Sequence, residues 1–266
     1  MLISDDFTTM ALASGALVGL VCSYLGMFVV LRRIVFVGAS LAQAASAGVA
    51  LSALAHWPPA LGAGLAILLG VGVFAHEPGH RRLPAEAIVG AAWAAAGAAA
   101  VLFLAFAPHG ETHMLDLLFG NILGVTPDDI ALLAGAFAVV AAIHVAFAKE
   151  FQLLAFDPEM ARTLGYRVGA WNFLFFLTLG GAIAVAIRAA GVLLVFAMLV
   201  FPPMIGLLAS RRWAGACLVS AGAALGSVGL GVWASLRWDL PTGPAIVAVA
   251  FLGFLLASLL RSIRPD

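Results

Sequence analysis

The sequence between residues 170 and 209 reads AWNFLFFLTLGGAIAVAIRAAGVLLVFAMLVFPPMIGLLA and contains one charged residue, Arg188. A helix needs roughly 20 apolar residues to cross the hydrocarbon layer of a bilayer, so this stretch is long enough for two passes separated by Arg188. Lipid offers no hydrogen bonds to an open backbone, and long non-alternating runs of Ala, Leu and Phe therefore predict helices and exclude a β-barrel.

The rest of the chain has the same character. Of its 266 residues, 64% are hydrophobic and 10% are charged, and the mean hydropathy is +1.13. This composition leaves little room for a soluble domain, so residues 1–266 are predicted to form a single all-α transmembrane domain. Nine spans are predicted, and eight remain possible because several are close to the lower length limit. The nine are Met10–Leu31, Ile34–Ala55, Trp57–Ala75, Ala87–Ala107, Ile130–Ala148, Ala170–Ile187, Ala189–Ala209, Trp213–Leu236 and Gly243–Leu260.

The basic residues predict the orientation of these spans, because Lys and Arg flanking a span are biased to the cytoplasm. With the N-terminus outside, all of the 13 Lys and Arg residues except Arg188 and Arg237 lie on the cytoplasmic side. The turn at Asp239 is then external. We therefore expect a multi-pass protein of the bacterial plasma (inner) membrane.

The longest polar stretch on the cytoplasmic side, residues 149–169, is predicted to contain a short capped helix. Asp157 can accept from the first free amide groups, Pro158 suits the first helical position, Glu159 suits the positive end of the helix dipole, and Gly165 can end the helix in a left-handed conformation. Spacing alone leaves two interpretations open, an ordinary loop helix and a helix that contacts a cytoplasmic partner.

The chain contains no nucleotide site of its own. A Walker A loop needs a Lys after its last Gly, and the only lysine is Lys149, in the sequence Ala148-Lys149-Glu150. Any ATP hydrolysis that serves this protein is therefore expected to occur in a partner chain, and this chain is not expected to be an enzyme.

Five segments occur in the order found in one known family. They are LGMFVVLRR (25–33), LLFGNIL with TPDD (117–123 and 126–129), FDP (156–158), GVLLV (191–195) leading to Pro202, and DLPTGP (239–244). With these segments the chain resembles the zinc and manganese permeases of ABC importers over essentially its whole length.

The resemblance implies a type II importer permease fold and a homodimer of permeases. It also implies a cytoplasmic ABC ATPase dimer and an external metal-binding protein as partners. Zinc or manganese would be the transported ion, with no covalently bound cofactor and no nucleic-acid partner. It favours a coupling role for the short cytoplasmic helix, with Asp157, Pro158, Glu159, Ala161 and Gly165 at the ATPase contact.

The same resemblance implies a metal route along the second span, where the family has an acidic residue followed by a His. Here Ala39 and Gln43 stand at these positions, and neither is a good zinc ligand. Ser40, Gln43 and Ser46 are the predicted polar lining of the route.

Two further features are assigned to the route. His144 is the only ionisable side chain predicted inside a span, where such residues are costly in lipid and usually face the interior; snorkelling to the nearby cytoplasmic end is the alternative. The Pro202-Pro203 pair removes two backbone donors and predicts a kink in the seventh span.

Candidate metal ligands occur at the external end of the fourth span. His109, His113 and Asp116 fall at i, i+4 and i+7, and Glu111 lies between them, so a helix here could gather ligands for zinc or manganese. The alternatives are a polar loop with incidental histidines, or acidic groups that dock the external binding protein.

Three other functions remain open. A permease for a metal chelate, cobalamin or another small solute would not need the missing ligands at Ala39 and Gln43. A transport-deficient regulatory subunit would share the fold. An intramembrane enzyme would need paired acids, an activated Ser or a His-rich motif at membrane depth, and the predicted spans contain almost no such residues.

Overall fold

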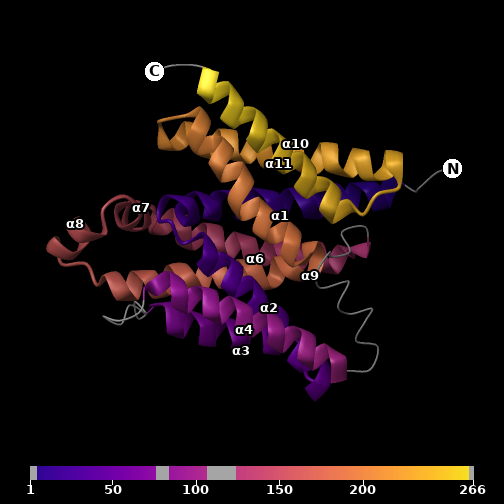
Figure 1. Cartoon of the computed structure of the whole chain (residues 1–266), viewed down its shortest axis with the longest axis horizontal. Coiled ribbons are helices and arrows are strands. Elements are labelled where there is room, and N and C mark those ends of the chain that lie inside the picture. Colours follow the sequence, from indigo (N-terminus) through magenta and orange to yellow (C-terminus); the bar gives the residue numbers. More distant parts are fainter. Residues whose placement is uncertain (1–4, 76–83, 107–123, 264–266) are drawn as a thin grey trace. The chain divides into compact units, whose positions relative to one another are not determined.

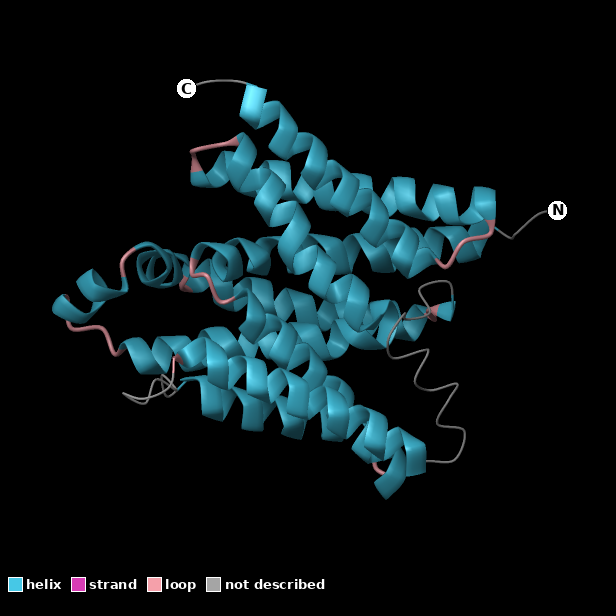
Figure 2. Ribbon diagram, in the orientation of Figure 1, coloured by secondary structure: helices cyan, strands magenta, loops and turns pink. Residues whose placement is uncertain are grey.

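The computed structural model describes residues 5–75, 84–106 and 124–263, and within these ranges the chain is helical with short connections and no strand (Figure 2). The helices, labelled in Figure 1, are α1 (Asp5–Leu31), α2 (Val35–Ala55), α3 (Pro59–Ala75), α4 (Ala85–Phe106), α6 (Pro127–Ala146), α7 (Ala148–Phe156), α8 (Pro158–Thr163), α9 (Val168–Ala209), α10 (Trp213–Trp238) and α11 (Thr242–Ile263).

Seven of the described helices are long and apolar enough to cross a membrane. The all-α prediction is confirmed, but the number of such helices is smaller than the eight or nine spans predicted. Two differences explain this. Helix α3 has 17 residues, and the sixth and seventh predicted spans both lie in α9, which has 42 residues.

Helix α9 is broken at Gly191, where φ is 75° and ψ is 163°. This backbone region is open essentially to Gly alone. This break was not predicted from the prolines; Pro202 and Pro203 lie further along α9 with helical dihedral angles, and the kink expected at them stays a prediction. Proline removes a donor, but its φ is compatible with a helix.

Pro203 in α9 allows a close contact with α1. Pro203 has no N–H, so the carbonyl of Leu199, four residues earlier, lacks its helical donor. A Cβ on Gly26 would lie 2.2 Å from that carbonyl oxygen and 2.6 Å from Cγ of Pro203. Only glycine at position 26 lets α1 approach this bare carbonyl.

The chain divides into two compact units, which we describe separately. The first comprises residues 1–30, 118–137 and 186–266, and the second comprises residues 31–117 and 138–185. In the first unit, Phe28 of α1 packs against Trp213 of α10 with ring centroids 5.0 Å apart. Helix α10 packs on α11, and a Cβ on Gly231 would lie 2.5 Å from Cα of Ile246.

In the second unit, α2 packs against both α3 and α4, and the three helices lie together in Figure 1. A Cβ on Gly48 would lie 2.2 Å from the carbonyl oxygen of Gly62, so the backbones of α2 and α3 are in direct contact. The hydroxyl of Ser52 donates to the Gly48 carbonyl at 3.0 Å. Small residues permit this approach, as is usual where helices associate in lipid.

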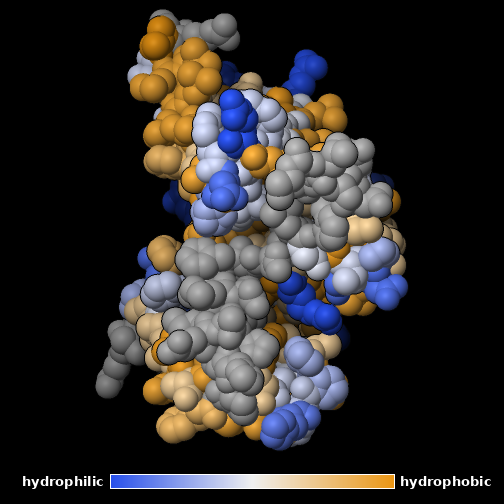
Figure 3. All heavy atoms as spheres, turned by 90° about the vertical axis from the view of Figure 1, so that its right-hand side faces the viewer, coloured by the Kyte–Doolittle hydropathy of each residue, from blue (hydrophilic) through white to orange (hydrophobic). Residues whose placement is uncertain are grey.

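Many exposed side chains are hydrophobic, and in the end view of Figure 3 they lie beside hydrophilic ones on the described residues. Large apolar side chains on several helices are more than two thirds exposed, among them Leu69, Val145 and Leu218. Exposed apolar surface of this extent is expected where lipid is the solvent.

Candidate functional site

Helix α2 carries the predicted polar lining of the route. Ser40 and Ser46 are 2% and 4% exposed, and Gln43 between them is half-buried. Ala39, which stands where a metal-binding acid is expected, is also buried. The hydroxyl and amide oxygens on this helix are neutral, so the described part of α2 offers weak, hard ligands and no anionic one.

The side chain of Gln43 lies beside α4. A Cβ on Gly97 would be 3.8 Å from both Cδ and Nε2 of Gln43, so the glycine leaves room for the amide between the two helices. The environment of Gln43 is thus formed by α2 and α4 of the second unit, a juxtaposition that the sequence alone does not predict.

His144 is buried in an aromatic cluster that includes a residue of α7. It is fully buried, its Nε2 lies 3.0 Å from the hydroxyl of Thr178, and its ring stacks on Phe151 of α7 with centroids 4.4 Å apart. Phe175 completes the cluster at 6.0 Å. The histidine therefore faces the protein interior, as expected of an ionisable residue in a span, and packs under α7.

The predicted cytoplasmic helix is present as α8, with the predicted caps. The carboxylate of Asp157 accepts from the backbone N–H of Met160 at 2.8 Å, and a proline occupies the first turn. Gly165 has φ 85°. Its N–H donates to the carbonyl of Arg162 and that of Tyr166 donates to Ala161, a Schellman arrangement that ends the helix.

Helix α8 has one buried face and one exposed face. Ala161 is fully buried against Leu154 of α7 and Val168 of α9. Met160 and Leu164 are 52% and 60% exposed, and Asp157, Pro158 and Glu159 are exposed too. Ala161 thus packs α8 against other helices of the second unit. The side chains that are available to a partner are those of the exposed residues on either side of Ala161 in the sequence.

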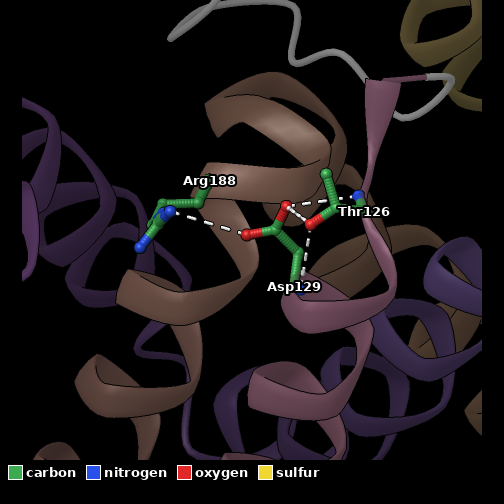
Figure 4. A network of polar contacts seen from close by, with 3 residues as sticks. All are labelled: Thr126, Asp129 and Arg188. Atoms are coloured by element: carbon green, nitrogen blue, oxygen red, sulfur yellow. Dashed lines mark hydrogen bonds and ion pairs between the residues drawn. The ribbon is translucent and has the colours of Figure 1, made fainter.

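A polar network fixes the beginning of α6 (Figure 4). The carboxylate of Asp129 accepts from the backbone N–H and hydroxyl of Thr126 at 3.2 and 2.7 Å, and Arg188 of α9 lies 3.5 Å from its other oxygen. Thr126 and Asp129 form a capping box, which the Thr-Pro-Asp-Asp sequence could have predicted. The ion pair is exposed, so it contributes little to stability.

The described residues contain no group of three or more His, Cys, Asp or Glu side chains placed to hold a metal ion. The predicted external cluster of His109, Glu111, His113 and Asp116 lies outside the described residues. Pro202 is buried in α9 of the first unit, so its place in a route remains a prediction.

Comparison with known proteins identifies the family. Residues 4–261 match the ABC 3 transport family. The chain belongs to the ABC 3 transport family. It is 29% identical over 257 residues to the manganese transport system membrane protein MntB of Synechocystis sp., covering 95% of this chain and 82% of the relative. It is also 29% identical over 262 residues to a probable iron transport system membrane protein of Haemophilus influenzae, covering 97% and 95%.

The fold is similar to that of a solved structure. PsaBC from Streptococcus pneumoniae, in complex with Fab, matches with a TM-score of 0.85 and 25% identity over 94% of this chain and 90% of the other. The resemblance predicted from the five sequence segments is thus confirmed. This ABC 3 family member is a multi-pass transport protein of the plasma membrane.

Proposed function

We propose that this chain is the membrane-spanning subunit of an ABC importer for a divalent metal ion, with manganese as the main substrate. The match to the ABC 3 transport family over residues 4–261 carries this proposal, together with relatives named as manganese transport proteins. A separate ATPase subunit hydrolyses ATP, because the single Lys149 does not lie in a Walker A loop.

The chemistry of α2 supports manganese over zinc. Zinc is held best by His, Cys and carboxylate ligands, whereas carbonyl and hydroxyl oxygens suit Mn²⁺ better. Ser40, Gln43 and Ser46 supply only neutral oxygens. A weak site also suits transport, since an ion must enter and leave. The predicted cluster of His109, Glu111, His113 and Asp116 would make the first external contact.

We assign the ATPase contact to the exposed face of α8. Its apolar side chains Met160 and Leu164 lie outside the spans and are exposed, which makes them suitable for a groove on a partner. Asp157 and Gly165 fix the ends of the helix, and buried Ala161 holds it on its unit. The proposed assembly contains two copies of this chain, two ATPase subunits and an external metal-binding protein.

Uptake by the purified complex tests the proposal. Proteoliposomes holding this chain with its ATPase, with ATP inside and binding protein outside, should accumulate Mn²⁺ above the level reached with a non-hydrolysable analogue. Met160→Glu should lower ATPase retention during purification, whereas Gln152→Glu in α7 should not. Absence of ATP-dependent accumulation of any divalent ion would refute metal import.

A second candidate is import of a metal chelate or another small solute. The observation that favours it is the occupation of positions 39 and 43 by Ala39 and Gln43, which leaves the described route without an anionic ligand. Accumulation of cobalamin or an iron chelate by the same proteoliposomes, without uptake of free Mn²⁺, would establish this alternative.

A further inference from the structure

Arg32 is held by one face of α9. It follows the last residue of α1, and its guanidinium donates to Oδ1 of Asn172. Its Cζ atom lies 5.0 Å from the ring centroid of Phe175 and 5.7 Å from that of Phe176. Residues 172, 175 and 176 share one helix face, and all three are less than 9% exposed.

This contact is specific to arginine. Within the described part of the chain, no carboxylate pairs with Arg32. Burial lowers the pKa of Arg32 to about 10, which leaves it charged at neutral pH. Because an amide oxygen and two ring faces hold the cation, the planar guanidinium fits, whereas a lysine ammonium cannot both stack and donate in the same way.

The same face of α9 is connected to α8 by a continuous row of contacts inside the second unit. Phe175 meets Phe151 of α7 at 6.0 Å, and Phe151 meets Trp171 at 5.9 Å. Trp171 packs against the cluster that contains Leu154 and the buried Ala161 of α8. The chain of packed side chains thus runs from the proposed ATPase contact to Arg32.

Arg32 lies three residues before the start of α2. The turn between α1 and α2 contains Arg33 in a left-handed conformation with φ 57°, and α2 begins at Val35. Because Arg32 is held against α9, the nearby end of α2 is also restrained. Helix α2 carries Ser40 and Gln43.

We infer that Arg32 is a positioning residue that makes α8, the first turns of α9 and the start of α2 move as one body, so that displacement of α8 reaches the polar positions of α2. The inference rests on the proposed coupling role of α8. Because the contacts lie within one unit, it can also be tested without transport.

Distance measurement in the full-length chain tests the mechanical part. Spin labels at Phe36→Cys in α2 and Thr163→Cys in α8, in a background with Cys22→Ala and Cys217→Ala, should give a narrow distance distribution. Arg32→Lys should broaden it. A broad distribution before the Arg32 change, or an unchanged narrow one after it, overturns the inference whatever the chain transports.

Coupling is then measured in the complex with its ATPase. Arg32→Lys and Asn172→Leu should leave ATP hydrolysis near its original rate while Mn²⁺ transported per ATP falls on the order of ten-fold, the size expected from losing a charged hydrogen bond and ring contacts. Asn172→Asp, which keeps the acceptor, and Arg33→Lys should retain coupling.

The outcomes separate this inference from the proposed function. An unchanged ratio of Mn²⁺ to ATP, or a loss of ATPase activity in parallel with thermal stability, would show a purely structural role for Arg32. If the unsubstituted complex transports no Mn²⁺, metal import fails, and the spin-label distances still decide whether Arg32 joins α8 to α2.

Discussion

Helices α2 and α11 have nearly equal lengths, 21 and 22 residues, but opposite surroundings. In α2, 67% of the spanning stretch is buried inside the structure, against 17% in α11. Ala, Gly and Ser make up 13 of the 21 residues of α2 but 8 of the 22 residues of α11, which has seven Leu and Phe residues against four in α2. Both helices are apolar, and the more buried of the two is the one with the smaller side chains, which let helices approach.

The largest expected effect comes from removing a leucine side chain in each helix. Leu41 in α2 is fully buried and Leu256 in α11 is 59% exposed. Leu41→Ala should leave a cavity and lower the free energy of unfolding by roughly 2–5 kcal/mol, whereas Leu256→Ala should cost much less because lipid fills the space. Unfolding in mixed detergent–SDS micelles measures both. Equal losses would mean that protein, not lipid, covers α11.

A matched pair of glycines sharpens the comparison. A methyl group on Gly48 of α2 would lie 2.2 Å from the Gly62 carbonyl, whereas one on Gly253 of α11 would lie 3.5 Å from Cδ1 of Ile205. Gly48→Ala should therefore destabilise by about 1–3 kcal/mol through overpacking. Gly253→Ala should be neutral or slightly stabilising. Thermal unfolding in detergent distinguishes them, and a stable Gly48→Ala variant would contradict the close packing of α2 on α3.

The next effect concerns chemistry. Ala39→Asp combined with Gln43→His adds a carboxylate and an imidazole to α2, so uptake should shift toward zinc over manganese on the order of ten-fold. The control pair, Ala39→Asn with Gln43→Asn, adds only amides and should leave the preference unchanged. Competition between Zn²⁺ and Mn²⁺ in the uptake assay measures the shift. An unaltered ratio would remove α2 from the metal route.

The smallest expected effect compares two hydroxyls. Ser46 is buried in α2, and Ser258 is exposed on α11. Ser46→Ala should lower Mn²⁺ uptake roughly three-fold, as expected for one lost oxygen contact, with no change in thermal stability. Ser258→Ala should change neither quantity. Equal uptake by both variants would argue that the hydroxyl of Ser46 faces packed protein rather than the ion.

Much of the fold follows from the sequence because lipid demands long apolar helices. The second span was predicted at Ile34–Ala55 and α2 runs from Val35 to Ala55. The caps of α8 were predictable from Asp157 and Gly165, since they depend on local backbone groups. A division of the α9 stretch was predicted at Arg188, three residues before the actual break at Gly191, but the residue that breaks α9 was not, because the chain has 29 glycines and nothing local distinguishes Gly191 from the others.

The sites were less predictable because they depend on contacts between distant segments. Ala161 lies on the inward face of α8 only because Leu154 and Val168 cover it. Arg32 and Asn172 are 140 residues apart, and no periodicity links them. The sequence predicted which side chains could bind a metal ion or contact a partner, but not which of them the helices bring together.

Helix α8 also limits how many residues the segment between α7 and α9 can have. Surface loops usually tolerate inserted residues. Here the helix is fixed at Asp157 and Gly165, with Met160 outward and Ala161 inward. One residue inserted between Pro158 and Met160 would turn the following side chains by about 100°, bringing a larger side chain into the space of the Ala161 methyl. We therefore expect this segment to vary in composition on its outer face while its length stays constant.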